Sequence, residues 1–286
     1  MIRKALNMNR DYKRVLTVQD ISCFGQCSLT VALPVISACG VETVILPSAV
    51  LSTHTGGFSG FTFRDLTDDI PAITAHWCKE NIKFDAIYTG YLGSKRQIDM
   101  VKDMFASLGK EGFVKVVDPA MADNGKLYTG FDNEYAREMA TLCAQADIVL
   151  PNITEACFMT GFEYAEEYGE EYIETLLQAL AAYGMNNVVL TGVSYEKDFT
   201  GVVVKYDGRV KYYKHRRVPT SSHGTGDVFA SAFVGALMNG FDEYDSARIA
   251  ADFTLECIEL TVGDENHKYG VKFELAIPEL IKMLGK

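Results

Sequence analysis

The stretch SHGTGD, residues 222–227, runs without a break into the apolar segment VFASAFVGAL, residues 228–237. Two glycines around Thr225 let the backbone bend so that successive N–H groups point the same way, at the positive end of a helix dipole. Such a turn binds an anion without any lysine. Asp227, directly inside the turn, would repel a phosphate that was merely held there. A carboxylate in this place suits a hydroxyl that attacks a phosphate, so the stretch predicts phosphoryl transfer at the start of a buried helix.

A simpler interpretation of the same stretch is open. Thr225 and Asp227 would then only cap the helix, because hydroxyl and carboxylate side chains are common at helix starts. Other phosphate-binding patterns are absent, since the chain has neither G-x-x-x-x-G-K-[ST] nor a G-x-G-x-x-G that opens the first helix.

Outward from this helix, short apolar runs alternate with longer helix-like stretches. The expected strands are 14–18, 42–46, 85–89, 113–117, 147–150 and 187–190. The expected helices are 28–39, with Ser28 as N-cap, 71–81, 95–108, 133–145 and 170–183. This alternation predicts βαβ units around a mainly parallel sheet. The strands lack polar alternation, as expected for a sheet covered by helices on both faces.

Two parts of the chain depart from this alternation. Residues 201–206 and 209–214 flank Asp207-Gly208, a hairpin signature that predicts an antiparallel pair at one edge of the sheet. From Thr225 onward only helices are expected, at 225–239, 244–261 and 272–284.

The composition is that of a folded α/β protein. The 286 residues carry a formal net charge of −11, with 48% hydrophobic and 23% charged residues, enough apolar surface to exclude general disorder. No Pro- or Ser-rich linker and no internal repeat divides the chain. We therefore expect a polar N-terminal tail at 1–13 and one domain at 14–286.

The charge and the cysteines bear on partners and compartment. An acidic chain excludes a sequence-independent nucleic-acid binder, which needs clustered Lys and Arg. The most apolar run, 30–41, contains Pro34 and Gly40 and is too short to cross a bilayer. Arg3 and Lys4 precede no apolar core of a secretion signal. Seven cysteines without a C-x-x-C pair are typical of reduced thiols, so we expect a cytoplasmic protein with no membrane or nucleic-acid partner.

Polar side chains follow the expected strands. In a parallel sheet, ligands bind beyond the carboxyl ends of the strands. The residues that come at or just after these ends are Asp20, Gly90, Asp118, Asn152 with Glu155, and Thr191. Together they predict a binding site at that edge of the sheet.

The Gly-Thr-Gly-Asp stretch and its apolar helix resemble the C-terminal signature of the ribokinase-like kinases. Four more segments resemble, in the same order, segments of pyridoxal kinases: LSTHTGGF at 51–58, TGYLGS at 89–94, DPAM at 118–121 and PNITEA at 151–156. The similarity extends from Val15 to Thr261. It implies a ribokinase-like three-layer α/β fold, with a mainly parallel central sheet flanked by helices and an antiparallel hairpin at one edge.

The resemblance also implies an activity. Enzymes of this kind use ATP and a divalent cation such as Mg²⁺ to phosphorylate the 5′-hydroxymethyl group of pyridoxal, pyridoxine or pyridoxamine. The resemblance further implies a homodimer. The preferred vitamer, the preferred metal and any need for a monovalent cation stay open.

The resemblance assigns roles to the acidic residues. Asp227 matches the catalytic base, and the amides of Gly224, Thr225 and Gly226 would hold the developing charge. Asp118 and Glu155 match acids that bind or orient the metal, partly through water. Two alternatives remain, since Asp118 before a proline can be an ordinary turn residue and Glu155 can cap a helix.

Further residues match binding positions of the family. Those expected around ATP are Asn152, Glu155, Thr191, Val218, Pro219 and Thr220, with Gly224 and Gly226. Thr55 and Gly56 match positions that close over the pyridine ring, and Tyr91 would lie beside it. The alternative for Thr55 and Gly56 is a flexible turn. Residues 121–127 match a mobile flap, with a plain surface loop as the alternative.

Asp20 departs from the family pattern, because many pyridoxal kinases carry a serine just after the first strand. Ser22 would take that place if the loop is shifted by two residues. A carboxylate near the ring favours a cationic group, so we expect tolerance of pyridoxamine. Cys23 and Cys27 flank this region, where contact but no metal site is expected.

Several interpretations therefore stand side by side. The first is a vitamin B6 kinase, and the second is a kinase of the same fold acting on hydroxymethylpyrimidine or a sugar. The third is a non-catalytic protein that binds pyridoxal phosphate or a nucleotide, against which the retained Asp227 argues. His54 and His223 are interpreted as surface or packing residues. Tyr164, Tyr168 and Tyr172 are interpreted as one helix face.

Overall fold

The computed structural model describes residues 12–220 and 222–286, so the expected tail at 1–13 lies outside the described residues except for Tyr12 and Lys13. Within these ranges the main sheet has nine strands in the order β11-β10-β9-β8-β5-β4-β1-β2-β3. Its strands are β1 (Arg14–Ser22), β2 (Glu42–Leu51), β3 (Phe63–Asp65), β4 (Phe84–Thr89), β5 (Gly109–Val117), β8 (Ile148–Val149), β9 (Val188–Val193), β10 (Phe199–Tyr206) and β11 (Arg209–Arg216). A separate small hairpin joins β6 (Ala122–Asp123) to β7 (Lys126–Leu127).

The pairing confirms a mainly parallel sheet. Strands β2, β1, β4, β5, β8 and β9 pair in parallel. At one edge β10 and β11 are antiparallel, as the Asp207-Gly208 signature predicts, and both turn residues have positive φ (48° and 72°). The opposite edge differs from the prediction, because the short strand β3 pairs antiparallel with β2.

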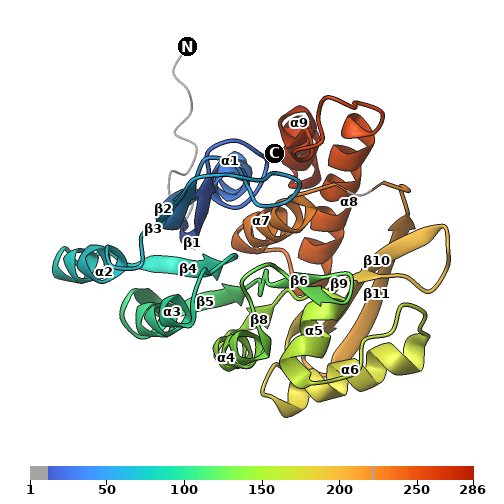
Figure 1. The fold of residues 1–286 in the computed structure, drawn as a ribbon, viewed down its shortest axis with the longest axis horizontal. Coiled ribbons are helices and arrows are strands. Elements are labelled where there is room, and N and C mark those ends of the chain that lie inside the picture. The colour runs from blue at the N-terminus through green and yellow to red at the C-terminus, as the bar shows by residue number, and fades with distance from the viewer. Residues whose placement is uncertain (1–11, 221) are drawn as a thin grey trace.

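Helices cover both faces of the sheet (Figure 1). One layer contains α1 (Leu29–Ala38), α7 (Thr225–Met238), α8 (Glu243–Thr261) and α9 (Phe273–Met283). The other contains α2 (Ile70–Lys79), α3 (Lys95–Ser107), α4 (Asn133–Cys143), α5 (Ile153–Thr160) and α6 (Glu170–Ala182). The three-layer fold is thereby confirmed, and the domain boundaries stay a prediction.

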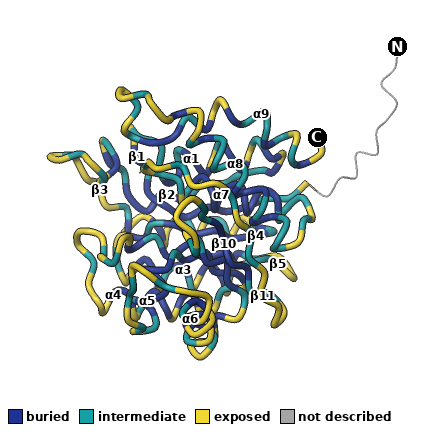
Figure 2. Tube along the Cα trace, turned by 90° about the vertical axis from the view of Figure 1, so that its right-hand side faces the viewer, coloured by how far each residue is buried: buried dark blue, intermediate teal, exposed yellow. Residues whose placement is uncertain are grey.

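Side-chain alternation along the strands explains the two cores. Val15 and Ala86 belong to the core on the side of α1, α7, α8 and α9, whereas their neighbours Leu16 and Ile87 belong to the core on the side of α2 to α6. All four are fully buried, so the strands need apolar residues at every position. Figure 2 shows buried backbone through the centre and exposed segments at the periphery.

The predicted strands at 14–18, 42–46 and 187–190 end too early, and for β1 and β9 this changes where site residues lie. β1 continues past Val18 because it stays paired with β2 as far as Ser22, with a bulge between Gln19 and Ile21. Asp20 therefore lies inside the strand. Thr191 likewise lies within β9, which remains paired with β10.

Ser28 is the N-cap residue of α1, as predicted, but it does not cap the helix with its side chain. Ser28 precedes the helix with φ 54°, and its side chain caps no backbone amide. The hydroxyl instead hydrogen-bonds the carboxylate of Asp20. Tertiary contact has thus replaced the local cap that the sequence favours.

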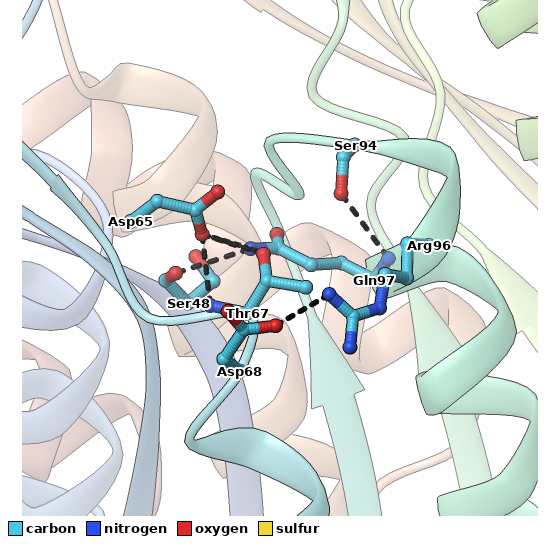
Figure 3. A network of polar contacts seen from close by, with 7 residues as sticks. All are labelled: Ser48, Asp65, Thr67, Asp68, Ser94, Arg96 and Gln97. Carbon is cyan, nitrogen blue, oxygen red and sulfur yellow. Dashed lines mark hydrogen bonds and ion pairs between the residues drawn. The ribbon is translucent and has the colours of Figure 1, made fainter.

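A buried amide on α3 joins three segments (Figure 3). Gln97 is 2% exposed, and its Nε2 donates to the carbonyl oxygen of Ser48 on β2 at 3.1 Å and to Oγ1 of Thr67 at 2.8 Å. Its Oε1 accepts from the amide of Gly93 at 2.7 Å, in the loop that carries Tyr91. Buried polar groups that lose their partners are costly, so this side chain fixes the loop between β4 and α3.

Replacing this amide should destabilise the fold. Gln97→Leu leaves the Gly93 N–H unpaired and removes one donor each from the Ser48 carbonyl and Thr67 Oγ1, and is expected to lower the free energy of unfolding by about 1–3 kcal/mol. Urea denaturation measures it. Asp99→Asn, on the exposed face of the same helix, should change the value by less than about 0.5 kcal/mol. Equal values for the two variants would contradict the assigned role.

Candidate active site

The turn before α7 has the geometry that an anion site needs. Gly224 is the N-cap residue and has φ 74°, a left-handed conformation that disfavours side chains. A Cβ at this position would lie 1.7 Å from the carbonyl oxygen of Gln26, so backbone from the β1–α1 loop packs directly against the turn. We call residues 222–227 the anion turn. The turn leads directly into α7, which is buried from Val228 to Ala236. The first amides of a helix have no partner within the helix, so they can bind an anion.

Asp227, in the first turn of α7, is half-buried. Burial raises the pKa of its carboxyl to about 7, helped by the negative charge of Asp20 and opposed by a hydrogen bond from the Ser28 backbone. Asp20 is 5% exposed, and its Oδ2 accepts from the Ser22 hydroxyl at 2.9 Å. Burial also raises the pKa of Asp20. Ser28 therefore contacts both carboxylates, and the structure brings Asp20, Ser22 and Asp227 together.

Two more carboxylates lie next to this pair. Asp118, buried just after β5, accepts from the amide of Ala120 at 3.1 Å. Burial and the charges of Glu155 and Asp227 raise the pKa of Asp118 well above its usual range. In Glu155, burial raises the pKa to about 7, although its oxygens accept from the amides of Met121 at 3.0 Å and Asn152 at 2.9 Å.

The capping alternative for Glu155 is confirmed, and it does not remove the carboxylate from the site. Asn152 and Glu155 form a capping box at the start of α5, in which Asn152 Oδ1 accepts from the Glu155 amide at 2.9 Å. The cap fixes the direction of the Glu155 side chain. The carboxylate still acts on Asp118, whose pKa it raises.

The donor set fits a hard divalent cation, which would relieve the repulsion between Asp118 and Glu155. Within residues 12–220 and 222–286 no cluster of three or more His, Cys, Asp or Glu side chains could hold a metal. Mg²⁺ sites commonly use one or two carboxylates, with water and phosphate oxygens as the other ligands.

A cleft of about 240 Å³ opens beside the capping box. Asn152 and Thr191 both line it and are joined by a β-bridge between α5 and β9. The remaining lining residues are Asp123, Asn124, Ile153, Thr154, Tyr164, Glu166, Tyr168, Gly192, Ser194 and Arg217. Val218, Pro219 and Thr220 follow Arg217 but do not line the cleft, so their role around the nucleotide stays a prediction.

The interpretation of Tyr164, Tyr168 and Tyr172 as one helix face is wrong. Only Tyr172 lies on α6, whereas the other two lie in the loop between α5 and α6 and line the cleft. The Tyr168 hydroxyl accepts from the amide of Ser194 at 3.0 Å. The four-residue spacing imitates a helix, and the glycine and the acidic residues around the tyrosines are the signal for a loop.

Residues 121–127 form neither a plain surface loop nor an isolated flap. Met121 and Ala122 are fully buried, and the hairpin β6–β7 then projects over the cleft. The amide of Gly125 donates to Oγ1 of Thr154 at 3.0 Å. Motion of this segment stays a prediction.

Residues 53–58 contain Thr55 and Gly56, which the family resemblance places over the ring of the acceptor, and we call them the acceptor loop. This loop lies against the anion turn. Thr55 is exposed, and a Cβ on Gly56 would lie 2.7 Å from the ring of His223, which shows how closely the two segments pack. Tyr91 is half-buried, and its pKa is raised by burial and by the charge of Asp20. Its ring centroid is 5.4 Å from that of Phe131. Tyr91 thus lies on the side of the site where Asp20 is found, and Gly56 lies beside His223 of the anion turn.

Cys27 also contacts this region. Its Sγ would lie 3.4 Å from a Cβ on Gly224. Burial, Asp227 and Asp20 raise the pKa of the Cys27 thiol. The thiol is therefore protonated at neutral pH, in line with the expectation that an acidic loop disfavours a thiolate.

Comparison with known proteins gives a consistent result. A family model described as phosphomethylpyrimidine kinase matches residues 30–271. The crystal structure of a candidate phosphomethylpyrimidine kinase from Bacteroides thetaiotaomicron, with pyridoxal, is 38% identical, covers 94% of this chain and 96% of that one, and has a TM-score of 0.89. Pyridoxal kinase from Lactobacillus plantarum is 31% identical over 95% and 97% of the chains, with a TM-score of 0.87. The hydroxymethylpyrimidine/phosphomethylpyrimidine kinase of Bacillus subtilis is 25% identical over 87% of this chain and 83% of that protein.

These similarities, with the three-layer fold, assign the molecule to the ribokinase-like kinases. Within that class the chain belongs to the phosphomethylpyrimidine kinase family. In the part of the chain that the structure describes, no helix has the length and apolar character to cross a membrane.

The anion turn should tolerate a methyl group at one glycine and not at the other. Gly224→Ala places a Cβ in left-handed backbone and against the Gln26 carbonyl, and is expected to lower the free energy of unfolding by about 2–4 kcal/mol. Gly226→Ala meets nothing within 4 Å and is the matched control, with a change below about 1 kcal/mol. Denaturation curves of both variants check this, and a stable Gly224→Ala protein would contradict it.

Proposed function

We propose that the protein transfers the γ-phosphoryl group of ATP to the 5′-hydroxymethyl group of a B6 vitamer: pyridoxal, pyridoxine or pyridoxamine. The observation that carries the proposal is Asp227, half-buried inside the anion turn with a pKa raised to about 7. A general base is most effective when its pKa lies near the working pH. The 38% identical relative crystallised with pyridoxal and the 31% identical pyridoxal kinase support this choice of substrate.

In this mechanism Asp227 accepts the proton of the acceptor hydroxyl as its oxygen attacks the γ-phosphorus. The amides of Gly224, Thr225 and Gly226 donate to the phosphoryl oxygens, where charge develops. Because the turn is held by the packing of Gln26 against Gly224, these donors are oriented before the reaction. Asp20 faces the same region and would contact the acceptor ring, beside Tyr91.

The nucleotide would lie in the cleft beside Asn152 and Thr191. Arg217 and Tyr168 are further candidates for contact with it, since both line the cleft. Asp118 and Glu155 would hold Mg²⁺, which shields the phosphate oxygens and orients them. The role of Val218, Pro219 and Thr220 beside the nucleotide is part of the proposal.

ATP consumption with Mg²⁺ tests the function, measured on pyridoxal, pyridoxine, pyridoxamine and hydroxymethylpyrimidine. A B6 vitamer should be turned over, and Asp227→Ala should lower kcat by about 10²–10⁴-fold because the base is lost. Asp103→Ala, on the exposed surface of α3 and outside both the cleft and the anion turn, is the matched control. Ligand binding without turnover of any alcohol would leave only a carrier of the ligands.

The pH profile gives a second test of Asp227. The base must be ionised, so kcat/KM should fall about tenfold per pH unit below about 7 and level off above it. The raised pKa of Asp227 places this acidic limb well above that of an ordinary Asp. A plateau that extends down to pH 5 would contradict Asp227 as the base.

Hydroxymethylpyrimidine is the second candidate acceptor. The family model and the relative from Bacillus subtilis favour it. Both acceptors present a hydroxymethyl group on a six-membered nitrogen ring, so the same anion turn and base would serve either. Activity on hydroxymethylpyrimidine alone would change the identity of the acceptor and leave the proposed mechanism as it is.

Asp20 should influence the choice among vitamers. Its carboxylate would favour an acceptor that carries a cationic group, as pyridoxamine does. Asp20→Ser should therefore lower kcat/KM for pyridoxamine several-fold more than for pyridoxal, in a parallel assay of the two. Ser22→Ala, which removes one hydrogen bond to Asp20, is the milder control. An unchanged ratio would remove Asp20 from substrate selection.

The family resemblance further supports a single domain at 14–286, a homodimer and a cytoplasmic enzyme. Light scattering on the purified protein gives its mass in solution and so tests whether it is a homodimer.

A further inference from the structure

Four loops from distant parts of the sequence meet at the side chain of His54. This residue is 5% exposed. Its backbone amide donates to the carbonyl oxygen of Phe24 at 3.2 Å, which ties the acceptor loop to the β1–α1 loop. Its ring lies 5.1 Å from that of His223 in the anion turn and 5.0 Å from that of Phe58. The fourth segment is the α8–α9 loop, which supplies Tyr269.

The two ring nitrogens have separate partners. Nδ1 accepts from the backbone amide of Gly56 at 3.1 Å, so it carries no proton. Nε2 lies 3.0 Å from the carbonyl oxygen of Tyr269 and therefore donates to it. The same carbonyl accepts from the amide of Gln26 at 3.0 Å. One neutral tautomer thus satisfies both ends of the ring, and burial lowers the pKa of His54 in agreement with that form.

The space around the ring is set by glycines. A Cβ on Gly25 would lie 2.1 Å from Cδ2 of His54, and a Cβ on Gly56 would lie 2.7 Å from the ring of His223. The two histidines therefore fit between bare backbone segments. His223 directly precedes Gly224, so His54 and Gly56 pack against the outer end of the anion turn.

We propose that His54 is a positioning residue that sets Thr55 and Gly56 of the acceptor loop against the anion turn, so that acceptor binding depends on the Nδ1 bond to Gly56. The identity of the acceptor rests on the function proposed above. The nucleotide cleft lies on other residues and does not include His54 or His223. Loss of the bond should therefore weaken binding of the acceptor and leave binding of the nucleotide unchanged.

Three substitutions separate the two bonds of the ring. His54→Asn has an amide oxygen near the place of Nδ1 and keeps an acceptor for Gly56. His54→Gln reaches toward Nε2 and keeps a donor for Tyr269. His54→Leu keeps the volume and neither bond. Phe84→Leu, a core change in β4 away from these loops, is the control for general loss of stability.

The measurements are Kd for pyridoxal, hydroxymethylpyrimidine and ADP by calorimetry, and KM and kcat for acceptor and ATP. His54→Leu and His54→Gln should raise the acceptor Kd and KM about tenfold, with the ADP Kd changed less than about twofold. His54→Asn should stay within about threefold of the wild type. Phe84→Leu should leave the Kd values for the acceptor and for ADP unchanged.

Two results would overturn the proposal. The first is equal acceptor Kd for the Asn and Gln variants, which would make the Gly56 bond irrelevant. The second is a parallel loss of acceptor and ADP binding in the His54 variants, which would mark a merely structural role. A wild type that binds pyridoxal and phosphorylates none of the alcohols would overturn the proposed function, while the order of Kd among the variants would still decide the role of His54.

Discussion

Asp20, Asp118, Glu155 and Asp227 lie at one edge of the sheet, and each carries a carboxyl whose pKa is raised by burial or by a neighbouring charge. A group of acids this close resists full ionisation. Most of the surrounding polar structure offsets that repulsion. Hydrogen bonds from Ser22, Ser28 and the backbone at 120–122 all point into the group. A divalent cation bound at these carboxylates would offset the negative charge that remains.

The parallel sheet is what brings these acids together. Asp118 follows β5, Glu155 opens α5 after β8, and Asp20 lies at the end of β1, so chain segments more than a hundred residues apart meet at the same edge. Because both faces of the sheet are sealed by helices, this edge is where polar groups can reach a ligand. The antiparallel strands β10 and β11 extend the sheet beyond it and bring Arg217 to the cleft.

The parts of this arrangement that could be predicted from sequence are those encoded within a few residues. The anion turn, the capping box of Asn152 and Glu155, and the Asp207-Gly208 hairpin each follow from local chemistry. Contacts over long distances in the chain could not be predicted in the same way. The four-residue spacing of Tyr164 and Tyr168 is that of a helix face, although both lie in a loop. Ser28 has the sequence pattern of a side-chain cap, but its hydroxyl hydrogen-bonds Asp20 instead. His54 shows no local pattern at all, because its partners are at residues 24, 56, 223 and 269.

The packing of Gln26 has a consequence for how the molecule is made. Its carbonyl oxygen packs against Gly224 and its side chain packs against Gly270. Its backbone amide donates to the carbonyl oxygen of Tyr269. The loop that follows the first strand is therefore closed by segments that a ribosome produces some two hundred residues later. β1, β2, β4 and β5 are synthesised before residue 118, whereas the contacts that hold Gln26 are complete only when the α8–α9 loop has emerged. The site can therefore be complete only after almost all of the sheet and of both helical layers has been synthesised.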